Sequence, residues 1–357
     1  MKAELLKNRL LAGLAALSFA LVSTTSCSAQ TGIWTSAAEL AKIPMSGPAW
    51  DAVLLGASQD CSHPDVANQD DDTNVYVLAA AIVYARTGDA RYKDKVVAAC
   101  EKLVAKGHLG GKSLAWGRET GAYAMAADLA GYRTPAFETW LRNMAETYKA
   151  EDKRTLRKMF EKRANNWGSH AFGALGAIYL YLGDHAALAA IREYWIRGVV
   201  GPNPGFKYDD DDLSWHADEN NLRLFNPKNA MKKGMKIDGA IPDDMRRGGS
   251  FQSPPQYTNY AWGFMQGQVM AARILERAGM PIWAAGDSAL YRAAYCLQVR
   301  FENQYGGWAA KGDDEWMLPF LDQAYGTKWS AKQKNLWAHG KNAGWGYVTL
   351  ATKSANP

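Results

Sequence analysis

Two stretches of this chain combine residue types that could act together on an anionic substrate. The first contains Asn166 and His170, which are four residues apart and therefore share one face of a helix. Asn165 or Asn166 suits the N-cap of that helix, because an asparagine side chain accepts hydrogen bonds from free backbone N–H groups. An amide and a titratable imidazole would then lie at a helix N-terminus, where the dipole favours anions. The alternative is an ordinary cap followed by a core histidine.

The second stretch places two arginines, Arg246 and Arg247, shortly before two tyrosines, Tyr257 and Tyr260. Arginine presents a planar fork of donors that suits a carboxylate. A tyrosine held close to a positive charge loses its proton more easily, because that charge favours the phenolate. These features indicate a site that binds a carboxylate and moves a proton.

Together the two stretches resemble the alginate lyase superfamily of polysaccharide lyases. The matching positions are Asn165-Asn166, the Asp238–Pro242 segment, Arg247-Gly248 and Tyr257. The resemblance implies an all-α fold: an incomplete α/α toroid (α/α barrel) of helical hairpins with a substrate cleft or tunnel. It also implies cleavage of a 1,4-linked polyuronate without a metal or organic cofactor. One position departs from the family pattern, because Trp167 stands where those lyases have a histidine, and the histidine comes at His170.

The implied reaction, β-elimination, removes the C5 proton of a uronate, which is a poor acid until the adjacent carboxylate is neutralised. Asn166 and Arg247 suit that task. Tyr257 can take the proton and protonate the leaving oxygen when both lie on the same face of the sugar. When they lie on opposite faces, a histidine is the separate base. His170 is then the first choice and His216 the reserve.

Other side chains are candidates for holding the polymer. The predicted substrate-binding set comprises Arg118, Tyr123, Trp167, His216, Arg246 and Tyr260. In this set the arginines would grip neighbouring carboxylates, and Tyr260 would form a subsite wall. Trp116, Trp167 and Trp262 could stack on sugar rings, although indole side chains more commonly fill cores.

Hydrophobic periodicity predicts a train of helices that must position these residues. The expected spans are 73–87, 90–106, 117–132, 134–150, 153–163, 167–182, 185–199, 258–279 and 284–300. Residues 30–72 read as irregular, because prolines and a glycine interrupt them. Residues 200–250 read as a long loop, which in a compact domain is usually functional. Residues 344–350 suit a short closing strand.

The acidic runs and the cysteines do not indicate a metal site. Asp70–Asp72 lacks the glycine and distal glutamate of an EF-hand loop, so we expect this run to start a helix. Asp209–Asp212 is expected to be solvated. No metal-ligand spacing surrounds Cys61, Cys100 or Cys296, and an odd number of cysteines argues against a disulfide framework.

The composition and the N-terminus suggest an exported globular protein. The chain has 357 residues, of which 48% are hydrophobic, so it can bury a large core. A net charge of +5 is mild and does not call for a nucleic acid partner. Residues 1–29 read as an export signal whose apolar run, Leu10 to Val22, is too short to span a membrane. Cleavage after Ala29 releases a soluble product, and lipid attachment at Cys27 is the alternative.

We therefore predict an export signal at 1–29 and a single α/α-toroid lyase domain at 30–357. The location is periplasmic or secreted, with an outer-membrane lipoprotein as the alternative. The expected partner is an anionic polysaccharide, either mannuronate-containing alginate or glucuronan, and we expect a monomer. An α/α-barrel glycoside hydrolase stays open, because the acidic runs could supply the two carboxylates that hydrolysis needs. A non-catalytic polyanion-binding protein is a further alternative.

Overall fold

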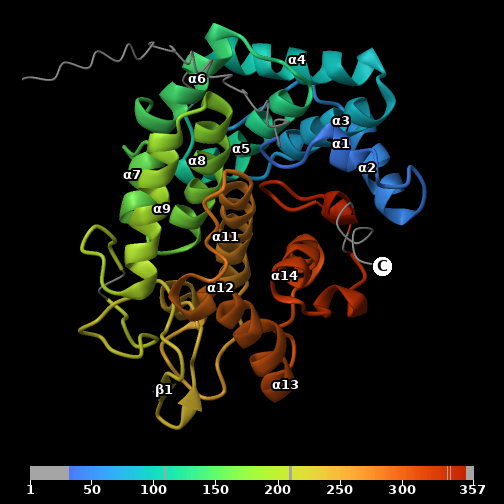
Figure 1. The fold of residues 1–357 in the computed structure, drawn as a ribbon. Coiled ribbons are helices and arrows are strands. Elements are labelled where there is room, and N and C mark those ends of the chain that lie inside the picture. Colours follow the sequence, from blue (N-terminus) through green and yellow to red (C-terminus); the bar gives the residue numbers. More distant parts are fainter. Residues whose placement is uncertain (1–31, 108–109, 209–210, 336, 338, 351–357) are drawn as a thin grey trace, which may run out of the picture. The chain divides into compact units, whose positions relative to one another are not determined.

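The computed structural model describes residues 32–107, 110–208, 211–335, 337 and 339–350, which all fall in one compact unit of the chain. Regular structure in this part is almost entirely helical (Figure 1). The α-helices are α1 (Ala37–Leu40), α2 (Pro48–Ser58), α3 (Thr73–Thr87), α4 (Ala90–Lys106), α5 (Ser113–Leu129), α6 (Pro135–Glu146), α7 (Leu156–Lys162), α8 (Asn166–Leu182), α9 (His185–Val200), α10 (Pro242–Met245), α11 (Tyr260–Arg277), α12 (Ala285–Tyr295), α13 (Glu302–Tyr305) and α14 (Leu318–Tyr325). The all-α class predicted from periodicity is confirmed.

Shorter elements connect these helices. The 3₁₀ and π turns are η1 (Arg246–Gly248), η2 (Cys296–Phe301), η3 (Gly312–Met317), η4 (Trp329–Lys332) and η5 (Gly346–Thr349). The two strands, β1 (Met231–Lys232) and β2 (Met235–Lys236), pair antiparallel as a small hairpin.

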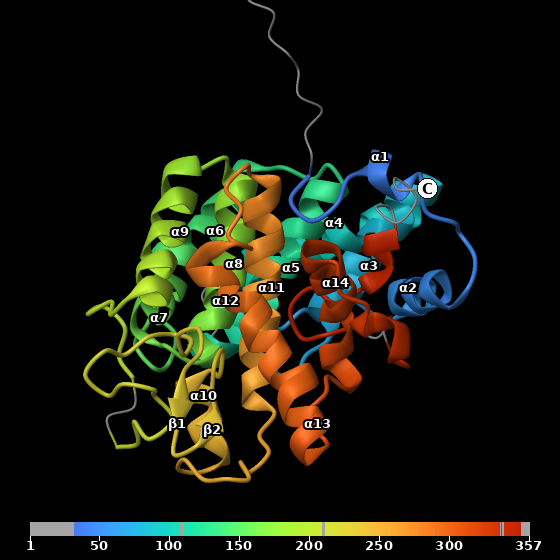
Figure 2. The same ribbon diagram turned by 60° about the horizontal axis from the view of Figure 1, so that its bottom comes forward.

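Helices α8 and α11 lie side by side and run in the same direction (Figures 1 and 2). Near their starts, Gly263 of α11 faces the side chain of Asn166 of α8. One turn later, a Cβ on Gly267 would lie 2.2 Å from the carbonyl oxygen of Ser169, so only glycine permits this close approach. The parallel packing brings the N-termini of the two helices together.

Helices α5 and α3 continue this inner group. A Cβ on Gly117 of α5 would lie 3.0 Å from the backbone nitrogen of Ala171 of α8, so the backbones of these two helices also approach closely at a glycine. At the start of α3, the Asn74 side chain donates to the carbonyl oxygen of Arg118, 3.3 Å away. All four helices are buried along most of their length. They therefore form the interior on which the outer helices pack.

Outer helices cover this interior. Helix α4 packs on α3, while α6, α7 and α9 pack on α8. Stacked rings join three of these helices. Phe172 of α8 lies 5.0 Å from Phe160 of α7 and 5.9 Å from Trp195 of α9, measured between ring centroids. Burial of three large rings is a strong apolar contribution to this contact.

Local signals read from the sequence appear at two helix starts. Helices α3 and α4 have the predicted bounds. The Asp70–Asp72 run starts α3 as expected: Asp72 is the N-cap residue, and Asp71 accepts a hydrogen bond from the Thr73 hydroxyl at 2.7 Å. At α8 the N-cap is Asn165, whose side chain accepts from the Trp167 N–H at 3.2 Å. Asn166 is thus the first residue of α8.

Three expectations about local structure were wrong. Residues 30–72 contain helices α1 and α2, because Pro48 occupies the first helical position, where its missing N–H costs nothing. Residues 200–250 are not wholly irregular, since they hold the β1–β2 hairpin and α10. Gly346–Thr349 forms a 3₁₀ turn instead of a closing strand.

Three further observations concern the described residues. No helix among them combines the length and apolarity needed to cross a membrane. In the same part of the chain, no three His, Cys, Asp or Glu side chains are grouped to hold a metal ion. Cys61, Cys100 and Cys296 are buried free thiols. The predicted export signal and Cys27 lie outside the described residues.

Candidate active site

Asn166 lies where the first turns of α8 and α11 meet. Its side chain is 1% exposed, and its Oδ1 has no hydrogen-bond partner among the described protein atoms. Its backbone N–H donates to Oδ1 of Asp244 at 3.1 Å. Since a Cβ on Gly263 would be 3.9 Å from the amide nitrogen, the amide lies against the start of α11. An amide at two adjacent helix N-termini is well placed to meet an anion.

Asp244 links Asn166 to the predicted arginines. This carboxyl is fully buried in α10, and burial raises its pKa well above the usual range, with the charge of Asp243 acting in the same direction. The Asn166 N–H and the charges of Arg247 and Arg246 act in the opposite direction. The two motifs recognised in the sequence therefore meet through one buried side chain.

The two adjacent arginines have different neighbours. The guanidinium carbon of Arg247 lies 3.9 Å from the ring centroid of Tyr260, and both side chains are exposed. Arg246 instead forms an ion pair with Asp243, with Nε 3.1 Å from the carboxylate oxygen. Arg247 is consequently the more accessible of the two predicted carboxylate ligands.

Arg118 of α5 interacts electrostatically with the same tyrosine. Burial lowers the pKa of this half-buried guanidinium. The charges of Glu119, Asp70 and Asp313, together with Tyr260, raise it. Tyr260 thus contacts Arg247 and is within electrostatic reach of Arg118, and both arginines suit an acidic sugar.

Tyr257 faces a different set of side chains. It is 37% exposed, and its hydroxyl donates to Oδ1 of Asn259 at 2.9 Å. Its ring lies 5.3 Å from Trp308 between centroids, and the Lys311 ammonium lies 4.3 Å from its ring centroid. Burial raises the pKa of Tyr257, the charge of Lys311 lowers it, and Asp314 and Asp313 raise it. The cation beside Tyr257 is therefore Lys311.

His170 is a residue of α8 and lies where this helix packs against α5 and α11. It is 1% exposed, and neither ring nitrogen has a partner within hydrogen-bonding geometry. Burial lowers its pKa well below the ordinary value, and the charge of Arg118 acts in the same direction. The side chain of Asn342 lies close enough to oppose this shift. The imidazole is accordingly neutral near pH 7, the form that a general base requires.

His216 lies in the long loop and is 3% exposed. Its ring packs edge-on against Tyr208, with 5.0 Å between centroids. Burial lowers its pKa to about 4, and the charge of Lys232 acts in the same direction. Trp215 fixes this loop by donating from Nε1 to the carbonyl oxygen of Gly249 at 2.9 Å. His216 is therefore also neutral near pH 7.

Many buried polar side-chain atoms of the described residues have no protein partner. They include atoms of Asn74, Glu119, Thr120, Tyr123, Asn166, His170, Asp244, Gln266, Asp314 and Asn342. A buried polar atom without a hydrogen bond is costly, and the candidate-site residues Asn166, His170 and Asp244 each carry such an atom. Sequence reasoning missed Glu119, Asp314 and Asn342, because no local motif distinguishes them.

Several aromatic side chains considered as sugar contacts are buried in the core, the commoner place for the tryptophans among them. Tyr123 has no exposed surface, and burial raises the pKa of its hydroxyl well above the usual value. Tyr123 is as deeply buried as Asn166 and His170, and its role in binding the polymer stays a prediction. Trp116 and Trp262 are also fully buried, with indole N–H groups that donate to backbone carbonyls. Trp167 is half-buried, with the Arg163 guanidinium carbon 5.5 Å from its ring centroid.

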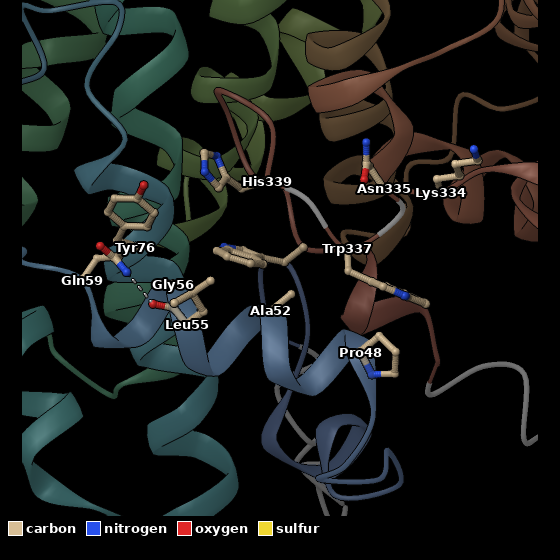
Figure 3. Close-up of a pocket in the computed structure, with 11 residues that line it drawn as sticks. Pro48, Ala52, Leu55, Gly56, Gln59, Tyr76, Lys334, Asn335, Trp337 and His339 are labelled. Atoms are coloured by element: carbon tan, nitrogen blue, oxygen red, sulfur yellow. Dashed lines mark hydrogen bonds between the residues drawn. The ribbon is translucent and has the colours of Figure 1, made fainter.

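A pocket of about 450 Å³ lies elsewhere, between α2, α3 and the C-terminal segment (Figure 3). Tyr76, Trp337 and His339 contribute rings to its wall. His339 Nδ1 lies 3.9 Å from a carboxylate oxygen of Asp72 at the start of α3. None of the predicted catalytic residues lines this pocket. This pocket is therefore not the candidate active site, which we assign instead to the residues around Asn166, Arg247 and Tyr257.

Comparison with known protein families gives a match over most of the helical part of the chain. A family model described as alginate lyase matches residues 73–299. The matched span includes Asn166, Arg247 and Tyr257 and ends before Lys311. No curated protein matches the chain at a significant level.

Proposed function

This chain belongs to the alginate lyase family, and on that premise we propose that it cleaves 1,4-linked polyuronates, mannuronate-containing alginate first among them, by β-elimination. It is a polysaccharide lyase with an all-α fold of the incomplete α/α-toroid type. Glucuronan is the alternative substrate for the same chemistry.

One observation carries the proposal: an amide, guanidinium groups and two exposed tyrosines gather at the N-termini of α8 and α11. Asn166 lies at the first turn of α8, and its backbone N–H donates to Asp244. The same carboxyl interacts electrostatically with Arg247. Arg247 covers Tyr260, the first residue of α11. Tyr257 precedes this helix by three residues. Helix dipoles and arginine both favour a carboxylate at this place.

Each step of the elimination has a candidate residue. The Asn166 amide and the Arg247 guanidinium bind the uronate carboxylate and stabilise the charge that develops on it. The C5–H bond then breaks as a base takes the proton. Its electron pair forms the C4=C5 double bond while the C4–O4 bond breaks. The O4 oxygen leaves with a proton supplied by the Tyr257 hydroxyl.

The identity of the base depends on the sugar. In a substrate whose C5 proton and O4 lie on the same face, Tyr257 as phenolate takes the proton and returns it to O4. In a substrate with the two on opposite faces, a neutral histidine takes it. His170 is the first candidate, because it follows Asn166 by one turn of α8. His216 is the reserve, since its lowered pKa also leaves it neutral.

We further propose that the enzyme acts outside the cytoplasm as a monomer. The basic and apolar pattern of residues 1–29 supports export to the periplasm or beyond. Lipid attachment at Cys27, giving an outer-membrane lipoprotein, is the alternative. Mass spectrometry of the mature N-terminus distinguishes cleavage after Ala29 from lipidation of Cys27.

A substrate panel tests the reaction. The purified protein is incubated with polymannuronate, polyguluronate and glucuronan, and near-ultraviolet absorbance reports the unsaturated uronate. We expect absorbance to rise with at least one polymer. New reducing ends without absorbance would instead mean hydrolysis, and polymer binding without either signal would mean a binding protein.

A further inference from the structure

The positive charge beside Tyr257 comes from a part of the chain outside the region matched by the family model. Lys311 immediately precedes η3, and its Nζ lies 4.3 Å from the centroid of the Tyr257 ring. The family match ends at residue 299. Tyr257 and Lys311 are 54 residues apart, so only the fold brings them together.

The hydroxyl of Tyr257 is hydrogen-bonded to Asn259, the residue at the N-cap position of α11. Asn259 is the N-cap of α11, yet its side chain makes no capping hydrogen bond. Its Oδ1 instead accepts from the Tyr257 hydroxyl at 2.9 Å. An N-cap asparagine ordinarily satisfies a backbone N–H of its helix. This one orients the tyrosine instead.

A buried acid lies behind Asn259. Asp314 of η3 is fully buried, and its Oδ1 accepts a hydrogen bond from Gln266 Nε2 at 2.8 Å. Burial raises the pKa of Asp314 to about 7, while Gln266 and Asn259 lower it. Asn259 accepts from the Tyr257 hydroxyl and is close enough to the Asp314 carboxyl to lower its pKa.

We propose that Lys311, Asn259 and Asp314 are positioning residues that prepare Tyr257 for proton transfer. Asn259, supported by Asp314, directs the hydroxyl, and Lys311 stabilises the phenolate. The inference rests on the role of Tyr257 in the proposed function.

Burial keeps the pKa of Tyr257 raised, and the charges around its ring act on that pKa in opposite directions. When Tyr257 ionises, its proton passes to solvent and a negative charge develops on the phenolic oxygen. Lys311 is the cation that favours this charge, whereas Asp313 and Asp314 disfavour it. A cation a few ångströms from a partly exposed phenol shifts its ionisation, because water screens the pair only in part.

The charge contribution can be measured without substrate. Protein carrying tyrosine labelled with ¹³C at Cζ is titrated by NMR, and the Tyr257 signal is identified by its loss in Tyr257→Phe. Lys311→Met should move the Tyr257 titration midpoint upward by about one pH unit. Lys311→Arg should keep the midpoint near the wild-type value.

A matched lysine controls for general effects of removing a charge. The ammonium of Lys93 lies 5.6 Å from the ring centroid of Tyr84, on the α3–α4 hairpin. Lys93→Met should leave the Tyr257 midpoint unmoved. An unmoved midpoint in Lys311→Met would overturn the role of Lys311.

The positioning contribution is tested through Asn259→Ala. Because the Asn259 side chain does not cap α11, the change should barely alter Tm, while kcat falls about tenfold and KM stays within twofold. Thr134 caps α6 through its hydroxyl, so Thr134→Ala should lower Tm and leave kcat unchanged. Unchanged kcat in Asn259→Ala would overturn the role of Asn259.

Failure of the two proposals can be told apart. If no polyuronate is cleaved by the wild-type protein, the proposed function fails, whatever the NMR titration shows. If cleavage requires Tyr257 but neither Lys311→Met nor Asn259→Ala has the expected effect, the function stands and this inference fails.

Discussion

Arg247 lies over the ring of Tyr260, with its guanidinium carbon 3.9 Å from the ring centroid, and not over the ring of Tyr257. Tyr257 has Lys311 at 4.3 Å from its centroid instead. The two tyrosines of the motif therefore have separate cations. The Tyr260 pair suits carboxylate binding, and the Tyr257 pair suits proton transfer.

Replacement of Tyr257 by phenylalanine removes the hydroxyl and keeps the ring that packs on Trp308. We expect turnover to fall by about 10²–10⁴-fold, the usual contribution of a positioned acid or base, with polymer binding within a few-fold. Absorbance assays and calorimetric binding measure the two effects. Tyr305→Phe is a suitable control, because the Tyr305 hydroxyl contacts Met235 Sδ outside the site. Near-normal rates in Tyr257→Phe would show that another group moves the proton.

Replacement of Arg247 by methionine removes the exposed guanidinium that we assign to the uronate carboxylate. We expect kcat/KM on polyuronate to fall about 100-fold, because charge developing on the carboxylate loses its strongest partner. Arg197→Met is a matched control, since Arg197 lies over the ring of Tyr194 at 5.5 Å on α9. Equal effects of the two changes would contradict a specific role for Arg247.

Replacement of His170 by alanine should slow substrates that react by anti elimination more than those that react by syn elimination. Because His170 is buried, the cavity should also lower the free energy of unfolding by about 1–3 kcal/mol. The ratio of rates on polymannuronate and polyguluronate separates the two effects, since lost stability does not change that ratio. If only His216→Ala changes the ratio, the base lies in the long loop.

Asp314 makes the stability of the protein depend on pH. Its pKa is raised to about 7 in the folded protein from an ordinary 3.8. The contribution of the protonated carboxyl to the free energy of unfolding is therefore fully present below pH 3.8 and is lost as pH rises through about 7. Relative to Asp314→Asn, the wild type should lose up to about 1.4 kcal/mol of unfolding free energy per pH unit in this window. Urea denaturation at several pH values measures the difference.

Glu39 is a suitable control, because its pKa is shifted in the direction opposite to that of Asp314. Although burial alone would raise its pKa, hydrogen bonds and the charge of Arg277 lower it to about 2 from 4.5. Its contribution is therefore present above pH 4.5 and lost as pH falls toward 2. The stability difference between wild type and Glu39→Gln should stay constant from pH 5 to 8. A constant difference for Asp314→Asn over the same range would contradict the buried acid.

Local sequence signals predicted those parts of the fold that depend on residues close together in the sequence. The bounds of α3 and α4 follow from apolar periodicity and from the Gly88-Asp89 turn between them. Asn165 caps α8 because its side chain reaches a backbone N–H two residues on. The same reasoning missed α2, where Pro48 was taken as a breaker although proline is common at the first helical position.

The sequence by itself determined the all-α class and most of the helices, because these depend on apolar periodicity and helix caps. It also determined the motifs that contain Asn166, Arg247 and Tyr257, because these are recognised by short spacings. The tertiary structure decided which cation meets which tyrosine and which acids are buried. Lys311 and Asp314 reach the Tyr257 site across more than 50 residues. That pairing depends on how η3 packs against α11, a long-range contact that no local pattern encodes.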